Sequence, residues 1–233
     1  MCDACGCGDT TIVPVEVHAR LLERNDHVAA HNREHFRRHD LTTINLMGSP
    51  GAGKTALLEA TARHLGDSRR LTALAGDLAT ERDAVRLRTA GIASSAITTG
   101  QACHLDAEMV HRALHDGIWP GADYLFIENV GNLVCPAIYD LGQEANVVAL
   151  SVTEGEDKPL KYPVMFRHAD LVVLTKTDLL PVLDFDRRAL EDALACVIPE
   201  PRLIALSARS GEGIDAWVAW LEGRRSVIAA AAS

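Results

Sequence analysis

GSPGAGKT, at residues 48–55, is the stretch of this sequence that decides its fold. It fits GxxxxGK[ST], the pattern of a loop that binds nucleotide phosphates. An apolar, strand-like segment at residues 44–47 precedes it and a helical pattern over residues 56–64 follows, which is the context the loop requires. A chance glycine-rich turn before a helix is the alternative, and the complete motif with both flanks argues against it. The sequence therefore predicts a nucleoside triphosphate site.

Each residue type in this loop has a role in holding phosphates. Glycines let backbone N–H groups turn inward around the phosphate oxygens, next to the positive end of the following helix. We expect Lys54 to neutralise the β- and γ-phosphates and the Thr55 hydroxyl to coordinate the Mg²⁺ that bridges them. The other nucleotide contacts expected from the loop are Gly48, Ser49, Gly51, Ala52, Gly53 and Ala56.

Outward from the loop, short β-rich segments alternate with helical stretches or longer connections. The expected strands cover residues 43–47, 71–75, 96–98, 124–128, 147–152, 171–175 and 203–206. This alternation is typical of βαβ units, and it predicts a three-layer α/β fold of the P-loop NTPase type with a mostly parallel sheet of about seven strands. We expect three parts: a flexible N-terminal metal-binding tail at 1–10, an N-terminal helical segment at 11–40, and the P-loop domain at 41–226.

The composition narrows the class of protein. Hydrophobic residues make up 48% of the 233-residue chain, charged residues 24% and aromatic residues 4%, which suits buried parallel strands covered by helices. A formal net charge of -9 argues against a protein that binds nucleic acid through its phosphates. No apolar run reaches membrane-spanning length and no signal-peptide pattern follows Met1, so we expect a cytoplasmic protein with no membrane partner.

A second motif selects the base of the nucleotide. The tetrapeptide TKTD follows an expected strand and resembles the guanine-recognition motif NKxD of GTPases. The Asp178 carboxylate can accept from the ring N–H and the exocyclic amine of guanine together, and adenine has no such pair of donors. Lys176 would lie along the purine face, while Ser207 and Ala208 would contact the guanine carbonyl. Thr175 stands where the pattern has Asn, which predicts a weaker tie to the phosphate loop.

Acidic residues between these motifs are candidates for Mg²⁺ binding and catalysis. Asp77 follows the second expected strand, Asp83 lies on the next helix, and Glu128 ends the strand that usually carries the Walker B acid. Gly131 could sense the γ-phosphate through its backbone N–H. Solvated strand-end acids and a turn glycine are the alternative. No glutamine stands where an attacking water would be positioned, so slow intrinsic hydrolysis is expected. The expected catalytic residues are Lys54, Thr55, Asp77 and Glu128.

The N-terminal tail carries three thiols within its first seven residues. In a cytosolic protein such cysteines are more often metal ligands or reactive thiols than disulfides. Gly6 lets the chain fold back so that Cys5 and Cys7 can meet one ion. With Cys2 and the neighbouring α-amino group they suit square-planar Ni(II), while the thiolates would also accept Zn²⁺. A tail with incidental cysteines is the alternative.

Further candidate metal ligands are dispersed. Cys103 and His104 are expected to begin a helix, and Cys135 comes just beyond the Walker B strand, where a bound metal could feel γ-phosphate-dependent movement. Adjacent side chains diverge, so Cys103 and His104 would more easily bridge two ions or two subunits than chelate one ion. This predicts an interfacial site shared by two chains, against the alternative of two buried thiols and a surface histidine. Cys196, in an apolar helix end, is expected in the core.

Histidines recur every four residues in the N-terminal segment. A helix from Val15 to about His39 is predicted by apolar positions at Val17, Leu21, Leu22, Val28 and Ala29. The histidines of that helix are His27, His31, His35 and His39. Each neighbouring pair shares a face and could chelate a transition metal. A polar stripe facing water is the interpretation we favour.

Taken together, the motifs resemble the hydrogenase nickel-incorporation GTPases of the HypB family. The likeness rests on the Cys-x-x-Cys-Gly-Cys start, GSPGAGKT, CHLDA, ENVGNLVCP, EGEDKPLKYP and TKTDLL, and it spans nearly the whole chain. It implies a parallel-sheet P-loop domain of the dimerising GTPase class. Its implied ligands are GTP, Mg²⁺, Ni²⁺ and Zn²⁺. Its implied partners are a second copy of the chain in a dimer favoured by GTP, a hydrogenase maturation protein and the hydrogenase large-subunit precursor.

The resemblance also assigns the two sets of metal ligands. The implied tight nickel site is formed by Cys2, Cys5 and Cys7, and the implied nickel or zinc site of the GTPase domain, at the dimer interface, by Cys103, His104 and Cys135. The leading hypothesis is a GTP-driven nickel metallochaperone for [NiFe]-hydrogenase. The alternatives are a metal-insertion GTPase for urease or a cobalamin enzyme, a non-catalytic nickel or zinc buffer, and a small-molecule kinase with a zinc staple.

Overall fold

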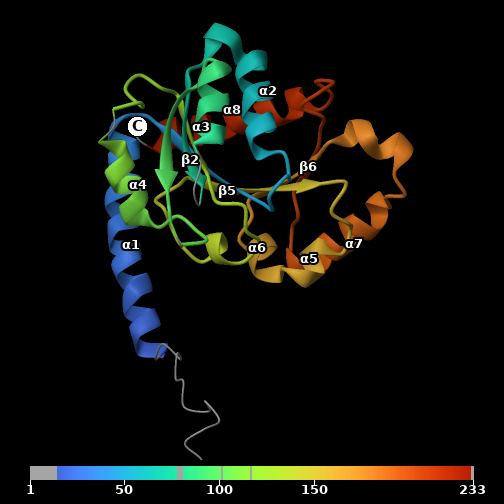
Figure 1. Cartoon of the computed structure of the whole chain (residues 1–233), viewed down its shortest axis with the longest axis horizontal. Helices are drawn as coiled ribbons and strands as arrows, with labels where there is room; N and C mark the ends of the chain where they lie inside the picture. Colours follow the sequence, from blue (N-terminus) through green and yellow to red (C-terminus); the bar gives the residue numbers. More distant parts are fainter. Residues whose placement is uncertain (1–14, 78–80, 101, 116, 232–233) are drawn as a thin grey trace, which may run out of the picture.

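In the part of the chain that the structure describes, seven parallel strands form one sheet with helices packed on both faces (Figure 1), and the strand order is β3-β2-β4-β1-β5-β6-β7. The computed structural model describes residues 15–77, 81–100, 102–115 and 117–231. The strands are β1 (Thr42–Met47), β2 (Leu71–Asp77), β3 (Ala93–Thr98), β4 (Tyr124–Glu128), β5 (Ala145–Ser151), β6 (Leu171–Thr175) and β7 (Leu203–Ala205). The prediction of a parallel α/β sheet is confirmed, with all seven strands at the expected segments.

Helices and short 3-10 turns connect the strands. The helices are α1 (Val15–Arg38), α2 (Lys54–Leu65), α3 (Arg82–Thr89), α4 (Ala107–Leu114), α5 (Lys158–Lys161), α6 (Pro163–Arg167), α7 (Arg187–Val197) and α8 (Ile214–Ala231). The 3-10 turns are η1 (Gly66–Ser68), η2 (Cys135–Ala137) and η3 (Thr177–Val182). No helix in the described part of the chain is long and apolar enough to cross a membrane.

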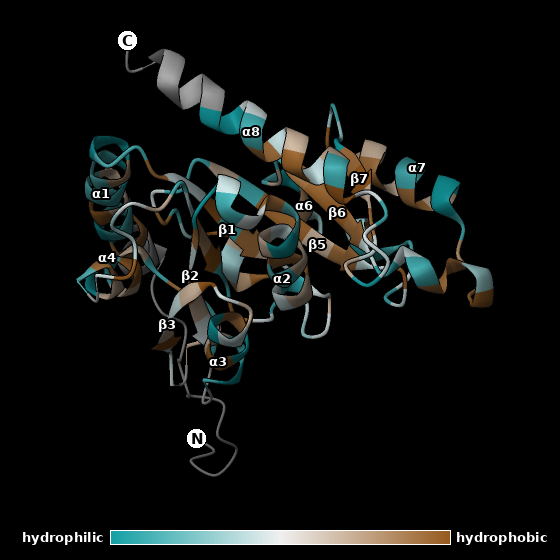
Figure 2. Cartoon of the chain, turned by 90° about the horizontal axis from the view of Figure 1, so that it is seen from above, coloured by the Kyte–Doolittle hydropathy of each residue, from teal (hydrophilic) through white to brown (hydrophobic). Residues whose placement is uncertain are grey.

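Helices cover both faces of the sheet, and every residue of the strands β1, β4 and β6 is buried. On one face Ile44 and Phe126 pack with Trp217 of α8 in a cluster that includes α2 and α3. On the other face, Leu125 packs beneath α4 and Val172 beneath α6 and α7 in two further clusters. Figure 2 shows β5 and β6 in hydrophobic brown and α1 mostly in hydrophilic teal. Helix-covered parallel sheets of this kind bind ligands at the carboxyl ends of their strands.

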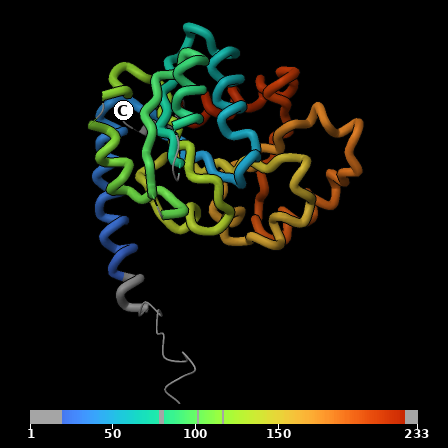
Figure 3. The backbone as a smooth tube through the Cα atoms, viewed as in Figure 1, coloured from blue at the N-terminus to red at the C-terminus, as the bar shows by residue number. Residues whose placement is uncertain are grey.

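Helix α1 lies beside α4 along one side of the molecule (Figures 1 and 3). Its buried face contains two asparagines, and Asn32 Nδ2 donates to the carbonyl oxygens of Ala107 and Leu141 at 2.9 and 3.2 Å. Asn25 Oδ1 accepts from the Ala107 backbone N–H at 2.9 Å. The predicted helix is confirmed, but Leu21 is 53% exposed. The docking surface of α1 is therefore partly polar, because it satisfies backbone groups at the start of α4.

The Cys196 prediction is wrong, since this thiol is exposed near the end of α7. Leu190, Ala193 and Leu194 form the buried face of that helix. Cys196 comes two residues after Leu194, which turns it about 200° around the helix from Leu194. The apolar neighbours in the sequence therefore belong to a different face of the same helix.

Candidate nucleotide and metal sites

The phosphate loop connects β1 to α2 at the carboxyl end of the sheet. Its backbone takes conformations that demand glycine at two positions. Gly48 has φ +144°, and a Cβ there would lie 2.4 Å from the Ala149 carbonyl oxygen. Gly53 has φ +91° directly before the first residue of α2. The loop can therefore pass close to β5 and turn its N–H groups toward the helix start, as phosphate binding requires.

The Lys54 side chain is held against the loop that carries it. Its Nζ donates to the carbonyl oxygens of Gly48 and Ser49, both at 3.2 Å, and the residue is 7% exposed. Burial lowers the pKa of Lys54, and the carboxylates of Glu128 and Asp83 oppose that shift. The ammonium group thus lies at the wall of the cavity, where phosphate oxygens would replace the loop carbonyls as its partners.

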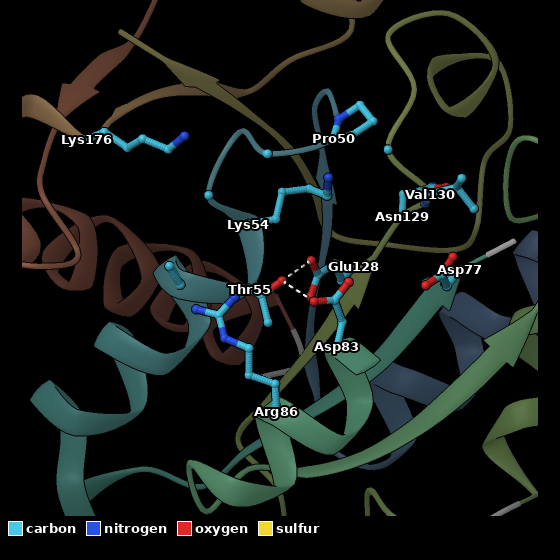
Figure 4. A pocket seen from close by; sticks show the side chains of 15 residues that line it. Pro50, Lys54, Thr55, Asp77, Asp83, Arg86, Glu128, Asn129, Val130 and Lys176 are labelled. Carbon is cyan, nitrogen blue, oxygen red and sulfur yellow. Dashed lines mark hydrogen bonds between the residues drawn. The ribbon is translucent and has the colours of Figure 1, made fainter. Parts of the chain in front are cut away.

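A cavity of about 490 Å³ opens in front of the loop (Figure 4). Thr55, Asp83 and Glu128 point toward one another inside it, and Asp77 stands to one side. Thr55 Oγ1 donates to Glu128 Oε1 at 2.7 Å and also lies 3.0 Å from Asp83 Oδ1. The structure thus brings all four expected Mg²⁺ and Walker B candidates to one cavity, with Asp83 in direct contact with Thr55.

The chemistry of this group fits a divalent cation with oxygen ligands. Glu128 is 3% exposed, and its Oε2 atom is buried with no hydrogen-bond partner among the described residues. Burial raises the pKa of Glu128 to about 7, although the hydrogen bond from Thr55 and the charge of Lys54 lower it. A cation would use the orphaned oxygen and stabilise the carboxylate, so the residues present suit Mg²⁺.

The segment after β4 touches the phosphate loop closely. A Cβ on Gly131 would lie 2.8 Å from Pro50 Cγ and 2.9 Å from the Pro50 backbone nitrogen. Gly48 and Asn132 also form an isolated antiparallel bridge. Gly131 therefore stands beside the mouth of the cavity, where it was expected to sense the γ-phosphate.

The expected base-recognition residues lie at the ends of β6 and β7. Ser207 is fully buried, and its Oγ donates to Asp178 Oδ1 at 2.7 Å, which fixes the carboxylate. Lys176 adopts φ +60° and lines the same cavity as the phosphate loop, and Ala208 follows Ser207. Thr175, for which a weaker tie than that of Asn was expected, does contact the phosphate loop, because its hydroxyl donates to the Ala52 carbonyl at 2.6 Å. A short hydroxyl reaches this carbonyl because β6 runs directly beneath the loop.

Cys103, His104 and Cys135 come together within one chain. Their ligand atoms all lie within 4.8 Å of one another, with the two Sγ atoms 3.0 Å apart and His104 Nδ1 4.0 Å from Cys103 Sγ. Two expectations are wrong here. The two adjacent residues do not begin a helix, since α4 starts at Ala107 with Asp106 as its N-cap. Their side chains do not diverge, because a bend at 103–104 turns both toward η2.

The surroundings prepare these three groups for a metal ion. The His104 ring stacks on Tyr139, with centroids 4.0 Å apart and planes 14° apart. Burial lowers the pKa of His104, which favours the neutral imidazole that binds metals. The hydrogen bond with Cys103 and burial raise the pKa of Cys135, so an ion must displace a thiol proton. Two sulfurs and one nitrogen suit Zn²⁺ or Ni²⁺ with a fourth ligand from elsewhere.

The other candidate metal ligands are the cysteines of the N-terminal tail and the histidines of α1. Cys2, Cys5 and Cys7 lie outside the described residues. His27, His31 and His39 are exposed, as the water-facing stripe predicts, although the Nε2 atoms of His27 and His31 are only 3.3 Å apart. His35 is partly buried against Trp119, with ring centroids 4.7 Å apart.

Several residues of these sites were missed from the sequence. Glu154, within the EGEDKPLKYP segment, accepts from the Ser49 hydroxyl of the phosphate loop and from the Ser151 backbone N–H at 2.8 Å. Tyr139 and Asn132 flank the metal ligands. Their motif neighbours were visible, but no local pattern says that a tyrosine or asparagine in a loop will contact a distant residue.

Comparison with known proteins places the chain among described families. The family "CobW/HypB/UreG, nucleotide-binding domain" matches residues 42–202. Hydrogenase maturation factor HypB of Azotobacter vinelandii is 51% identical over 213 residues, which are 91% of this chain and 70% of that protein. Hydrogenase maturation factor HypB of Escherichia coli (strain K12) is 48% identical over 214 residues, covering 91% of this chain and 73% of that protein.

Solved structures are similar over most of the fold. HypB from Helicobacter pylori in complex with nickel has a TM-score of 0.83 and 39% identity, covering 87% of this chain and 95% of that one. Hydrogenase maturation factor HypB from Archaeoglobus fulgidus has a TM-score of 0.80 and 38% identity, covering 88% of this chain and all of that one.

Proposed function

This chain belongs to the HypB family of hydrogenase maturation factors, and from this premise we propose that it hydrolyses GTP to control the delivery of nickel to a [NiFe]-hydrogenase precursor. One observation carries the proposal: a single short segment contains both Glu128 of the nucleotide cavity and Cys135 of the metal-ligand cluster. The two sites are therefore parts of one continuous piece of chain, only seven residues apart in sequence.

The nucleotide chemistry follows from the residues of the cavity. Lys54 would neutralise phosphate charge, and Thr55, with Asp77, Asp83 and Glu128, would hold Mg²⁺. Mg²⁺, when bound, neutralises charge that develops on the phosphate oxygens. No residue positioned for water activation was identified from the sequence, so turnover without a partner is expected to be slow.

Preference for guanine is proposed from the arrangement around Asp178. Its carboxylate accepts from Ser207, which orients it, and its second oxygen and remaining lone pairs can receive two N–H donors of guanine. Adenine would leave this acceptor unpaired, which costs affinity. Lys176 and Ala208 complete the proposed base site. GTP rather than ATP is therefore the expected substrate.

Nickel is the proposed cargo. Cys103, His104 and Cys135 would hold Ni²⁺ or Zn²⁺, and the tail thiols Cys2, Cys5 and Cys7 are retained as the proposed tight nickel site. The dimer favoured by GTP and the contacts with a maturation protein and the hydrogenase precursor rest on the family resemblance. A second chain would supply the fourth ligand if the cluster lies at a dimer interface.

A second substrate protein is worth testing because of one relative. The Hydrogenase/urease maturation factor HypB of Helicobacter pylori (strain ATCC 700392 / 26695) is 40% identical over 207 residues, covering 86% of this chain and 84% of that protein. Delivery to urease is therefore the alternative. Activation of purified apo-hydrogenase and apo-urease precursors by the nickel-loaded chain separates the two.

The experiment that tests the main proposal is a titration of the purified chain with Ni²⁺ and Zn²⁺, in GDP and in a non-hydrolysable GTP analogue. We expect Cys2→Ala to remove a tight nickel site and nucleotide to change metal binding only at the Cys103 cluster. GTP turnover without any nucleotide effect on metal binding would leave a GTPase and remove the delivery mechanism. Metal binding without GTP turnover would instead indicate a metal buffer.

A further inference from the structure

Asn132 lies between the phosphate loop and the metal ligands. It follows Gly131 in the segment after β4 and precedes Cys135 by three residues. Its backbone forms an antiparallel bridge with Gly48, the first residue of the phosphate loop. A Cβ at Gly48 would lie 2.4 Å from the Ala149 carbonyl oxygen, so the loop runs close to β5 at the same residue. Asn132 therefore contacts the nucleotide-binding backbone directly.

The side chain of Asn132 reaches the metal cluster. Its Nδ2 donates to the Cys103 carbonyl oxygen at 3.3 Å, and its Oδ1 accepts from the Val134 backbone N–H at 2.8 Å. The first bond holds one metal-binding residue, and the second shapes the turn that leads to Cys135. The Asn132 amide therefore holds the backbone at Cys103 through its nitrogen and the backbone just before Cys135 through its oxygen.

A neighbouring asparagine, Asn129, attaches the segment that contains Cys103 to the sheet. Asn129 is 1% exposed, and its Oδ1 accepts from the Leu105 backbone N–H at 3.2 Å. Its Nδ2 donates to Asn45 Oδ1 at 3.1 Å, within the central strand β1. The segment containing Cys103 is therefore held at Leu105 by the sheet and at Cys103 by the loop that contacts the phosphate site. If the loop moved relative to the sheet, the attachment at Cys103 would move relative to the attachment at Leu105, and the Cys103 thiol would move with it.

We propose that Asn132 is the positioning residue through which nucleotide occupancy of the phosphate loop changes the geometry of the Cys103, His104 and Cys135 ligands. The inference rests on the proposed function, because it names the connection by which GTP controls metal affinity. γ-Phosphate binding beside Pro50 and Gly131 would shift the segment, and the Asn132 amide would carry that shift to the Cys103 backbone. By linkage, metal binding must then change nucleotide affinity by the same factor.

Two substitutions separate this role from a general structural one. Asn132→Asp keeps an oxygen that accepts from Val134 N–H and loses the donor to the Cys103 carbonyl. Asn132→Ala loses both contacts. Because the alanine variant introduces no carboxylate, agreement between the two variants excludes a direct effect of the new charge on the metal. Val134→Ala is the matched control, since Val134 is 48% exposed beside Cys135 and its side chain forms none of these contacts.

The measurement is the ratio of Zn²⁺ or Ni²⁺ affinities in a non-hydrolysable GTP analogue and in GDP. It uses the whole 233-residue chain with Cys2, Cys5 and Cys7 changed to Ser, so that these thiols do not compete for the metal. In this parent chain, we expect the ratio to differ from one by about fivefold or more. The Val134→Ala variant of the parent chain should give the same ratio. With either Asn132 substitution, the ratio should come within about twofold of one.

The outcomes distinguish the inference from the proposed function. If the metal affinity of the parent chain is the same in both nucleotides, nucleotide control of metal binding fails and the inference fails with it. If the parent chain responds and the Asn132→Asp chain responds equally, only the role of Asn132 is overturned. Loss of the metal effect on nucleotide affinity must accompany the loss in the Asp variant by linkage, and an unfolding midpoint equal to that of the parent chain would show that the loss does not come from a destabilised fold.

Discussion

The nucleotide cavity and the metal-ligand cluster are built in different ways, although one segment joins them. Lys54 and Thr55 are each 7% exposed and Glu128 is 3% exposed, and all three are attached directly to β1, α2 or β4. Cys103 and Cys135 are only partly buried and belong to a bend and a 3-10 turn. The sheet therefore fixes the geometry of the first site, whereas the geometry of the second depends on loop contacts and on the ion itself.

The largest effect is expected from removing the charge at the phosphate loop. Lys54→Ala should lower GTP turnover by about 10²–10³-fold, because a preorganised cation that stabilises transition-state charge is lost. Zn²⁺ affinity of the Cys103 cluster without nucleotide should stay the same, since Lys54 touches none of its ligands. Phosphate-release kinetics and metal titration of the same preparation measure both quantities. Equal turnover in the two chains would show that the cavity is not the hydrolytic site.

The opposite test removes one metal ligand. Cys135→Ser should weaken Zn²⁺ or Ni²⁺ binding at the cluster by about 100-fold, because a thiolate ligand is replaced by a poor donor. GTP affinity without metal should not change. Cys196→Ser is the matched control, since that thiol is exposed on α7, away from both sites. Competition with a metal-binding dye gives the affinities, and equal loss in both variants would contradict the assignment of Cys135.

The pH dependence of stability tests the buried carboxylate. Glu128 has a folded-state pKa of about 7 against 4.5 for the ordinary group, chiefly through burial. Its contribution to stability is fully present below pH 4.5 and is lost as the pH rises through about 7, because the unfolded chain releases the proton first. The loss amounts to about 3 kcal/mol. Urea unfolding without nucleotide or Mg²⁺ should show this decline, and Glu128→Gln should remove it.

The same contrast explains what the sequence could predict. GSPGAGKT specifies a local backbone conformation, and β-rich segments that alternate with helical stretches indicate the strands around it, so the cavity and all seven strands were predictable. The direction of the Cys103 and His104 side chains depends on a bend that no local pattern encodes. The contacts of Asn132 and Tyr139 join residues distant in sequence, which periodicity cannot reveal. The Cys196 prediction failed because it rested on the apolar composition of the helix end, whereas helical periodicity places Cys196 about 200° around α7 from Leu194.

A smaller effect tests how firmly the base-recognition segment is tied to the phosphate loop. Thr175→Val removes the 2.6 Å bond to the buried Ala52 carbonyl and should reduce the free energy of unfolding by about 1–2 kcal/mol. Thr177→Val is the control, since Thr177 Oγ1 is buried without a hydrogen-bond partner among the described residues. That second change should be neutral or stabilising. Chemical denaturation of both variants measures the difference, and equal losses would show that the Ala52 contact contributes nothing specific.

The smallest effect concerns how much of the metal site is organised before an ion binds. Tyr139→Leu removes the ring stacked on His104 but keeps an apolar cover, and it should cost about 0.5–1.5 kcal/mol, which corresponds to a loss of Zn²⁺ affinity between about twofold and twelvefold. Tyr139→Phe retains the stack and should bind as the unchanged chain does. If both variants bind Zn²⁺ equally well, the metal ion itself orients His104. The metal-ligand cluster would then differ more strongly from the nucleotide cavity, whose side chains the sheet holds in place. If only the leucine variant is weaker, the loops around the cluster already hold His104 in place, as the sheet holds Glu128.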